Sequence, residues 1–151
     1  MIGADTLIVP LLQAFFWFDD GLQSYLQSKG WHQVTRPQSM VMAHVVMGVH
    51  NPSEIARSLG ISRQAVHTTI NQMVELGMLE LRDDNNDRRA KVVALTGRGQ
   101  EMREDADRVM SDLKAELCNR IGKRNVDNLI KAFSADWGAP ITTWPQADAE
   151  R

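Results

Sequence analysis

Residues 54–73 read EIARSLGISRQAVHTTINQM, a helical pattern that Gly60 interrupts and Ser62 restarts. Glycine adopts the positive φ that a tight turn between helices requires, and serine is a favoured N-cap residue for the next helix. The small side chain of Ala56 lets two helices cross closely. We expect the wedge between them to be filled by Ile55, Leu59, Ile61 and Val66. This combination predicts a helix-turn-helix.

The ends of the two helices are also marked in the sequence. Asn51 and Pro52 suit the N-cap and the first helical position. Glu54 stands where the acid of a capping box reaches back to the N-cap. Gly77 supplies a left-handed stop to the second helix, after which Met78 can fold back onto Met73.

The second helix of the pair carries a polar face. A helix that stands clear of its domain can place the side chains near its N-terminus against base edges in the major groove of DNA. Arg63 can bond guanine or a phosphate, whereas Gln64 and Asn71 have the donor and acceptor pair that adenine demands. The alternative is a solvated polar face. The candidate DNA-binding residues on this helix are Ser62, Arg63, Gln64, His67, Thr68 and Asn71.

A short hairpin is predicted directly after this helix. MLELR (78–82) and RAKVVAL (89–95) have the composition of strands, and the DDNND segment between them is rich in turn formers. The tip offers Arg88, Arg89 and Lys91, and an arginine there can enter a narrow minor groove. We expect Asp87 to support this wing by clamping the guanidinium of Arg89. The alternative is a charged, solvated turn.

Overall charge does not argue for nucleic-acid binding. The 151 residues carry a net charge of −2, and residues 51–96 contain six basic and six acidic side chains. Long-range attraction to DNA is therefore weak, and binding must depend on where the cations are placed.

The remaining segments are read as helices around this centre. Apolar residues recur at helical spacing over residues 6–28, and a second helix is expected between Thr35 and Gly48. Thr96 is expected to cap a long helix with an apolar seam from Met102 to Ile121, followed by a final helix. The apolar run 7–18 is too short to span a bilayer. We expect it to form the buried side of a helix whose apolar face is wide enough to pack against two partners, its own domain and another subunit. The fold class is mainly α with a small β-hairpin wing.

On the residues SEIARSLGISRQAVHTTINQMVELGMLE leading into DRRAKVVALTGRG, the chain resembles the MarR family, the multiple-antibiotic-resistance type of bacterial transcriptional regulator. The family's wing signature falls on Asp87, Arg89, Leu95, Thr96 and Gly99. Thr69 stands where the family usually has an apolar residue.

The resemblance implies one domain over residues 1–151. Its winged helix-turn-helix would occupy residues 36–96, between dimerisation helices at 6–34 and 97–137. The resemblance further implies a cytoplasmic homodimeric repressor that binds a pseudo-palindromic operator in double-stranded DNA and is released by a small effector.

An effector pocket is expected by resemblance between the dimerisation and DNA-binding parts. Aromatic walls with one imidazole suit an aromatic or carboxylate-bearing molecule, although core packing explains the same residues equally well. The candidate pocket residues are Phe15, Trp17, Phe18, Trp31 and His44.

Other functions have less support. The single cysteine, Cys118, excludes an internal disulfide. A redox switch there is an alternative, but a buried, inert thiol is favoured. The four histidines show no paired ligand spacing, so no metal site and no cofactor are expected. No catalytic motif is present, which argues against an enzyme. A winged-helix module that binds another protein remains the main rival, and no membrane association is expected.

Overall fold

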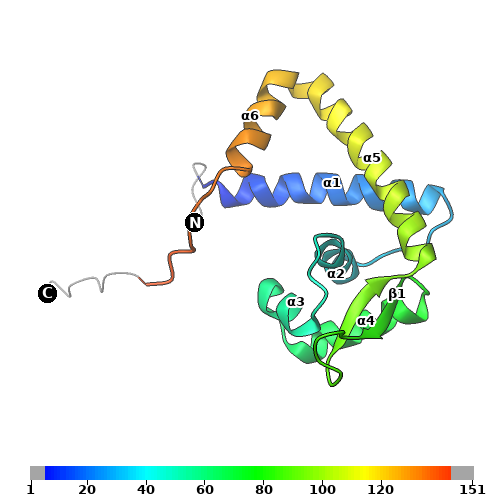
Figure 1. Ribbon diagram of the computed structural model, residues 1–151. Coiled ribbons are helices and arrows are strands. Elements are labelled where there is room, and N and C mark those ends of the chain that lie inside the picture. Colours follow the sequence, from blue (N-terminus) through cyan, green and yellow to red (C-terminus); the bar gives the residue numbers. More distant parts are fainter. Residues whose placement is uncertain (1–5, 144–151) are drawn as a thin grey trace, which may run out of the picture. The chain divides into compact units, whose positions relative to one another are not determined.

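The computed structural model describes residues 6–143, which form mainly helices and one hairpin (Figure 1). The fold class expected from the sequence is confirmed. The chain separates into two compact units, residues 1–113 and 114–151, and a single domain over 1–151 stays a prediction. The elements are α1 (Ile8–Ser28), α2 (Arg36–Val46), α3 (Pro52–Leu59), α4 (Arg63–Glu75), β1 (Leu79–Asp83), β2 (Lys91–Leu95), α5 (Gly97–Ile121) and α6 (Lys123–Phe133).

The first helix, α1, spans the predicted segment but does not bury its N-terminal half. Leu7, Ile8 and Leu12 are 59%, 61% and 51% exposed, so reading this run as the buried side of a helix is wrong for the single chain. Burial begins further along, at Asp19 and Leu26. Periodicity shows which residues share a helix face, but not which molecule covers that face.

Helices α2 and α3 begin at capping residues. Thr35 accepts from the backbone N–H of Gln38, and the Gln38 side chain accepts from the N–H of Thr35, which completes a reciprocal capping box. Asn51 Oδ1 accepts from the N–H groups of Ser53 (2.8 Å) and Glu54 (3.4 Å). The sequence places the Asn51 cap correctly. It did not indicate that the reciprocal box forms at Thr35.

The core of the first unit lies where α2, α3, α4 and the hairpin meet. Its fully buried side chains include Val41, Ile55, Val66, Ile70 and Met73. Ala56 is 3% exposed and Gly60 has φ 66° at the turn, as the helix-turn-helix requires. Ile61 is 42% exposed. It therefore does not fill the wedge between the helices, and that expectation is wrong.

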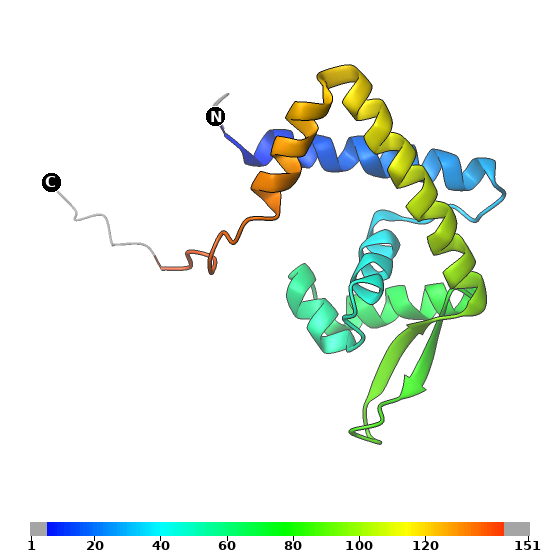
Figure 2. The same cartoon turned by 45° about the horizontal axis from the view of Figure 1, so that its top comes forward.

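The hairpin joins this core through its base. Strands β1 and β2 pair antiparallel, with Leu79 opposite Leu95 and Asp83 opposite Lys91. Before them the chain turns as expected at the end of α4, where Met78 N–H donates to Met73 O at 2.9 Å. Val93 N–H donates to His50 O at 2.8 Å, which ties the loop before α3 to β2. In two views the hairpin extends beside α4 (Figures 1 and 2).

The second unit contains the last turns of α5 and all of α6. Gly122 has φ 89° between the two helices. Leu129, Ile130 and Phe133 of α6 are 42–46% exposed. No helix in residues 6–143 has the length and apolar character needed to cross a membrane.

Candidate nucleic-acid interface

Helix α4 presents its predicted polar residues to solvent. Ser62 caps it by accepting from Ala65 N–H at 3.1 Å. The buried side chains of α4, among them Val66, Ile70 and Met73, lie on the opposite side of the helix from the exposed polar residues. Every candidate residue on this helix is exposed, namely Ser62, Arg63, Gln64, His67, Thr68 and Asn71.

Two neighbouring threonines on α4 use their hydroxyl groups within the helix. Thr68 Oγ1 donates to Gln64 O at 3.0 Å, and Thr69 Oγ1 donates to Ala65 O at 3.0 Å. Thr69 is only 7% exposed, and this bond explains how a hydroxyl is accommodated at a core position. In exposed Thr68 the same bond occupies the hydroxyl group, so the methyl group is the part of the side chain that remains for an apolar contact.

The far end of α4 is held by α2. Gln38 Nε2 donates to Gln72 Oε1 at 3.2 Å, between the first turn of α2 and the last turns of α4. Gln38 is buried and also completes the cap of α2. This hydrogen bond could not be predicted from the sequence, because the two glutamines lie 34 residues apart in the chain.

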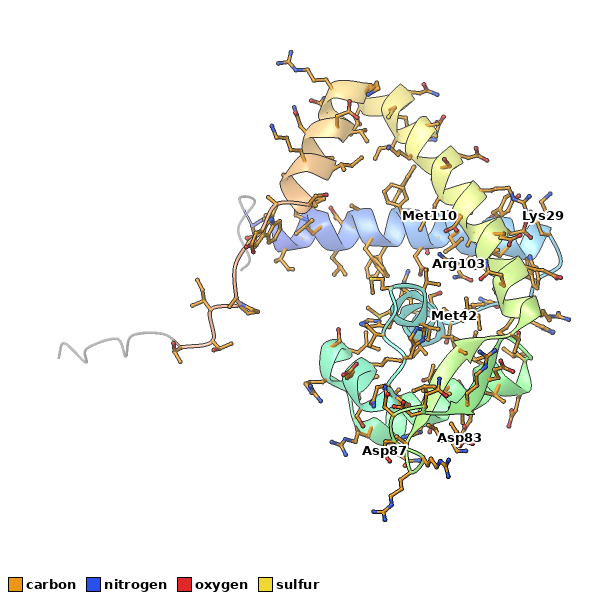
Figure 3. The ribbon with its side chains drawn as sticks, viewed as in Figure 1. Lys29, Met42, Asp83, Asp87, Arg103 and Met110 are labelled. Atoms are coloured by element: carbon orange, nitrogen blue, oxygen red, sulfur yellow. The ribbon has the colours of Figure 1, made fainter. Side chains whose placement is uncertain are left out.

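The wing tip is ordered by aspartate side chains. Asp84 Oδ1 accepts from Asn86 N–H and Asp87 Oδ1 accepts from Arg89 N–H, both at 2.9 Å. Asp87 therefore supports the wing through the main chain of Arg89 and not through its guanidinium, which corrects the expected clamp. Figure 3 labels Asp83 and Asp87 at this end of the hairpin.

Some cationic side chains of the candidate interface form an ion pair with a carboxylate, and others do not. Lys91 forms an ion pair with Asp83 across the two strands. Among residues 6–143, Arg63, Arg88 and Arg89 make no ion pair, and all three are exposed. An unpaired guanidinium can bond a phosphate without first breaking a salt bridge.

A cavity of about 220 Å³, here called the Phe15 cavity, lies in the first unit. It brings together three of the five candidate pocket residues, Phe15, Phe18 and His44. Trp17 and Trp31 do not line it. Trp17 instead packs edge-on against Phe18, with ring centroids 4.8 Å apart. The remaining lining residues are Asp19, Leu22, Ser39, Met40, Ala43 and Met110.

Two polar side chains that line the Phe15 cavity, Asp19 on α1 and His44 on α2, form hydrogen bonds with neighbouring residues. Asp19 is buried and accepts from Arg36 Nε at 3.0 Å. His44 Nδ1 donates to Met40 O at 2.7 Å, and its Nε2 lies 2.8 Å from Ser58 Oγ. No lysine or arginine lines this cavity, so its walls suit an uncharged aromatic molecule better than a carboxylate.

The other candidate chemistries have little geometric support. No group of three or more His, Cys, Asp or Glu side chains within residues 6–143 is arranged to hold a metal ion. Cys118 is half-buried, in the second unit.

Comparison with known proteins gives one family match. Residues 32–90 match the model of the MarR family, and this range includes α2, α3, α4, β1 and the wing tip.

Solved structures share the fold. Reduced MarR from E. coli is 21% identical with a TM-score of 0.70, covering 88% of this chain and 99% of that one. The repressor CouR, bound to a 23-mer DNA duplex, is 21% identical with a TM-score of 0.67, covering 86% and 91%. A mutant of S. aureus MepR, bound to an oligodeoxyribonucleotide, is 13% identical with a TM-score of 0.57, covering 85% and 93%.

Proposed function

We propose that this chain, whose residues 32–90 match the model of the MarR family, is a homodimeric repressor of transcription. It binds a pseudo-palindromic operator in double-stranded DNA. The observation that carries this proposal is the solvent-exposed polar face of α4, capped by Ser62 and lying beside a wing with the unpaired cations Arg88 and Arg89.

In this proposal each protomer reads one half-site. Arg63, Gln64 and Asn71 face base edges in the major groove, with His67 and Thr68 on the same exposed side. The free N–H groups at the start of α4 attract a phosphate, and Arg89 of the wing follows the adjacent minor groove. Two copies related by a two-fold axis place their α4 helices about one DNA turn apart, roughly 34 Å.

The exposed apolar residues of α1 support the proposed dimer. Leu7, Ile8, Val9 and Leu12 are each at least 40% exposed. Apolar side chains gathered on one stretch of surface mark an interaction site more often than an ordinary solvated face. A second copy of the chain is the partner that the operator symmetry requires.

We place the effector of this repressor in the Phe15 cavity. Its lining residues come from α1, α2 and α5, and α2 contacts α4 through the Gln38–Gln72 hydrogen bond. A molecule that binds one position of α2 more tightly than another shifts the population of DNA-competent dimers. Walls without a lysine or arginine favour an uncharged aromatic effector.

Fluorescence anisotropy with a DNA fragment upstream of the protein's own gene tests this proposal. Binding of nanomolar strength that weakens steeply with added salt is expected, because phosphate contacts release counterions. A shuffled fragment of equal length is the control and should bind far more weakly. If upstream and shuffled DNA bind equally at every salt concentration, the operator proposal is wrong.

A further inference from the structure

The first turn of α2 bonds to two other helices of the first unit. Toward α1, Arg36 Nε donates to Asp19 Oδ2 at 3.0 Å. Toward α4, Gln38 Nε2 donates to Gln72 Oε1 at 3.2 Å. In both views α2 lies between α1 and α4 (Figures 1 and 2). This turn, residues 36–39 and here called the α2 junction, therefore forms a direct polar link from α1 to the helix that presents the candidate DNA-binding residues.

Arg36 contacts three side chains of α1. Besides Asp19, its Nη2 lies 3.2 Å from Asp20 Oδ1, and its Cζ lies over the Phe16 ring, 4.0 Å from the centroid. A guanidinium group is rigid and planar, so bonds at its edge and a ring on its face fix its orientation. The side chain of Asp19 is only 8% exposed, so its carboxylate depends on Arg36 as a partner.

Apolar packing between α1 and α2 is interrupted by cavities. The Phe15 cavity and a second cavity of about 180 Å³ are both lined from these two helices. Side chains that border a cavity lack van der Waals partners on one side, so close packing restrains the helices less there. The restraint comes from the directional bonds of the α2 junction, which include a contact of 2.9 Å between Gln23 Nε2 and Ser39 Oγ.

We propose that Arg36 is a positioning residue for operator binding, because its bonds to α1 hold α2, and with it α4, at one angle to α1. The consequence for DNA rests on the proposed function, in which α1 joins the two protomers and each α4 reads one half-site. One base pair added between the half-sites rotates the second by roughly 35° and moves it by about 3.4 Å. A dimer with fixed α4 helices binds such an operator weakly, whereas a dimer with a loosened α2 junction adapts to it.

The first test requires neither DNA nor a dimer. Pulsed electron double resonance measures the distance between spin labels at Ser24→Cys on α1 and Glu75→Cys on α4, two exposed positions. The full-length protein carries Cys118→Ser and is diluted with unlabelled chains. The parent should give one narrow distance distribution. Arg36→Gln should give a broader one, because an amide cannot reproduce both the ion pairs and the ring contact of the guanidinium.

Arg108→Gln is the matched control. It makes the same change of charge, but the partner of Arg108 is Asp105 on the same helix, so the distribution should stay narrow. Asp19→Asn combined with Arg36→Ala removes both charges and leaves no unpaired buried carboxylate. This double variant should broaden the distribution as well, and it replaces Arg36→Gln if that protein does not fold. Circular dichroism and thermal melts verify the fold of each variant.

The second test measures the preferred spacing of the half-sites. Fluorescence anisotropy compares the upstream fragment with versions that have one base pair inserted or deleted between the half-sites. The parent should lose at least about tenfold in affinity on either change, the scale of one poorly fitted contact. Arg36→Gln should bind the unchanged operator about tenfold more weakly, as when roughly one dimer in ten has the required spacing, and should lose less than about threefold on either change.

Shuffled DNA separates positioning from a general loss of structure. Binding to it requires no particular spacing, so the parent and Arg36→Gln should bind it equally, which a partly unfolded variant would not do.

A distance distribution as narrow in Arg36→Gln as in the parent overturns the inference, and so does a broadening of equal size in Arg108→Gln. The same loss of affinity on insertion in parent and Arg36→Gln overturns it too, because α4 would then be positioned for DNA by other contacts. If the parent does not bind the upstream fragment at all, the proposed function fails, while the distance measurement still decides whether Arg36 holds α4 relative to α1.

Discussion

The indole Nε1–H of Trp31 donates a hydrogen bond to Asp105 Oδ2 at 2.7 Å, and so connects the segment before α2 to α5. This bond is the main cause of a lowered pKa of the Asp105 carboxyl group, and Arg108 adds to it. The sequence suggested Trp31 as an effector-pocket residue, but in the structure its indole bonds to α5 and does not line the Phe15 cavity.

Trp31→Phe should therefore raise the pKa of Asp105 toward its ordinary value, because the ring is kept and the donor is lost. Carboxyl ¹³C chemical shifts measured against pH report this pKa. Trp137→Phe is the control, since that indole donates to Ala132 O in the second unit. An unchanged pKa of Asp105 in Trp31→Phe would show that the bond does not form in solution.

The same bond has a consequence for stability. A carboxyl group with a lowered pKa in the folded state stabilises the fold above its ordinary pKa, and this contribution is lost as pH falls through the folded-state pKa. The difference in the free energy of unfolding between parent and Trp31→Phe should therefore be largest near neutral pH and shrink in acid. Denaturant unfolding at a series of pH values measures it.

Gly99 is required by the junction between hairpin and α5. A Cβ at this position would collide with the carbonyl oxygen of Met78, whereas a Cβ at Gly97 meets nothing within 4 Å. Met78 O also accepts from Thr96 N–H at 3.1 Å, so it cannot move away freely.

Gly99→Ala should destabilise the protein by about 1–3 kcal/mol, the usual cost of overpacking. Gly97→Ala should be neutral or stabilise by up to about 1 kcal/mol, because alanine is favoured over glycine in a helix. The melting temperatures of the two variants, measured by thermal unfolding, test this prediction. Equal melting temperatures would contradict the packing of this junction.

Local chemistry explains why so much of the fold could be predicted. Gly60, Ser62 and Gly77 act on the residues beside them, through positive φ or a cap. Their effects are therefore visible in a short stretch of sequence. The exposure of the α4 face follows in the same way from helical period.

Contacts between distant residues were not predictable in this way. Trp31 and Asp105 lie 74 residues apart in the chain, and nothing near either residue indicates the other. Ile61 shows the limit of pattern reasoning as well, since an apolar residue in a tight turn is exposed here. The Phe15 cavity is lined from three helices, and only part of its lining could be predicted from the sequence.

The exposed apolar stretch of α1 leads to a prediction about assembly. Leu12→Asp should shift the protein toward monomer, because a charge buried in an apolar interface is costly. Gln13→Asp adds the same charge at the neighbouring exposed polar position and is the control. Sedimentation equilibrium measures the association constant. A monomeric parent, or a Leu12→Asp variant as dimeric as Gln13→Asp, would rule out this surface as the dimer contact.

Arg89 should contribute to DNA binding without regard to sequence. Arg89→Ala is expected to weaken binding to all DNA fragments and to reduce the slope of log K against log salt by about 1, as for one lost phosphate contact. Lys131→Ala in α6 changes the charge equally and should leave the slope unaltered. A slope that changes equally in both variants would indicate only a general charge effect.

Thr68 should recognise a thymine through its methyl group. Its hydroxyl donates to Gln64 O at 3.0 Å, so in the proposed DNA complex the methyl group is the part of this side chain left to contact a base edge. Thymine carries the only methyl group on that edge of the bases. Replacing each operator thymine by uracil in turn removes only that methyl and should weaken binding about fourfold at one position, from about 0.8 kcal/mol for one buried methyl.

In Thr68→Ser, which keeps the hydroxyl, the uracil substitution at that position should cause no further loss, because the methyl partner is already gone. Thr68→Val keeps a methyl group and should retain the preference for thymine. Anisotropy titrations of the three proteins with the two DNAs form a double-mutant cycle whose coupling term isolates this contact. If every thymine-to-uracil change costs Thr68→Ser as much as the parent protein, Thr68 does not read a thymine.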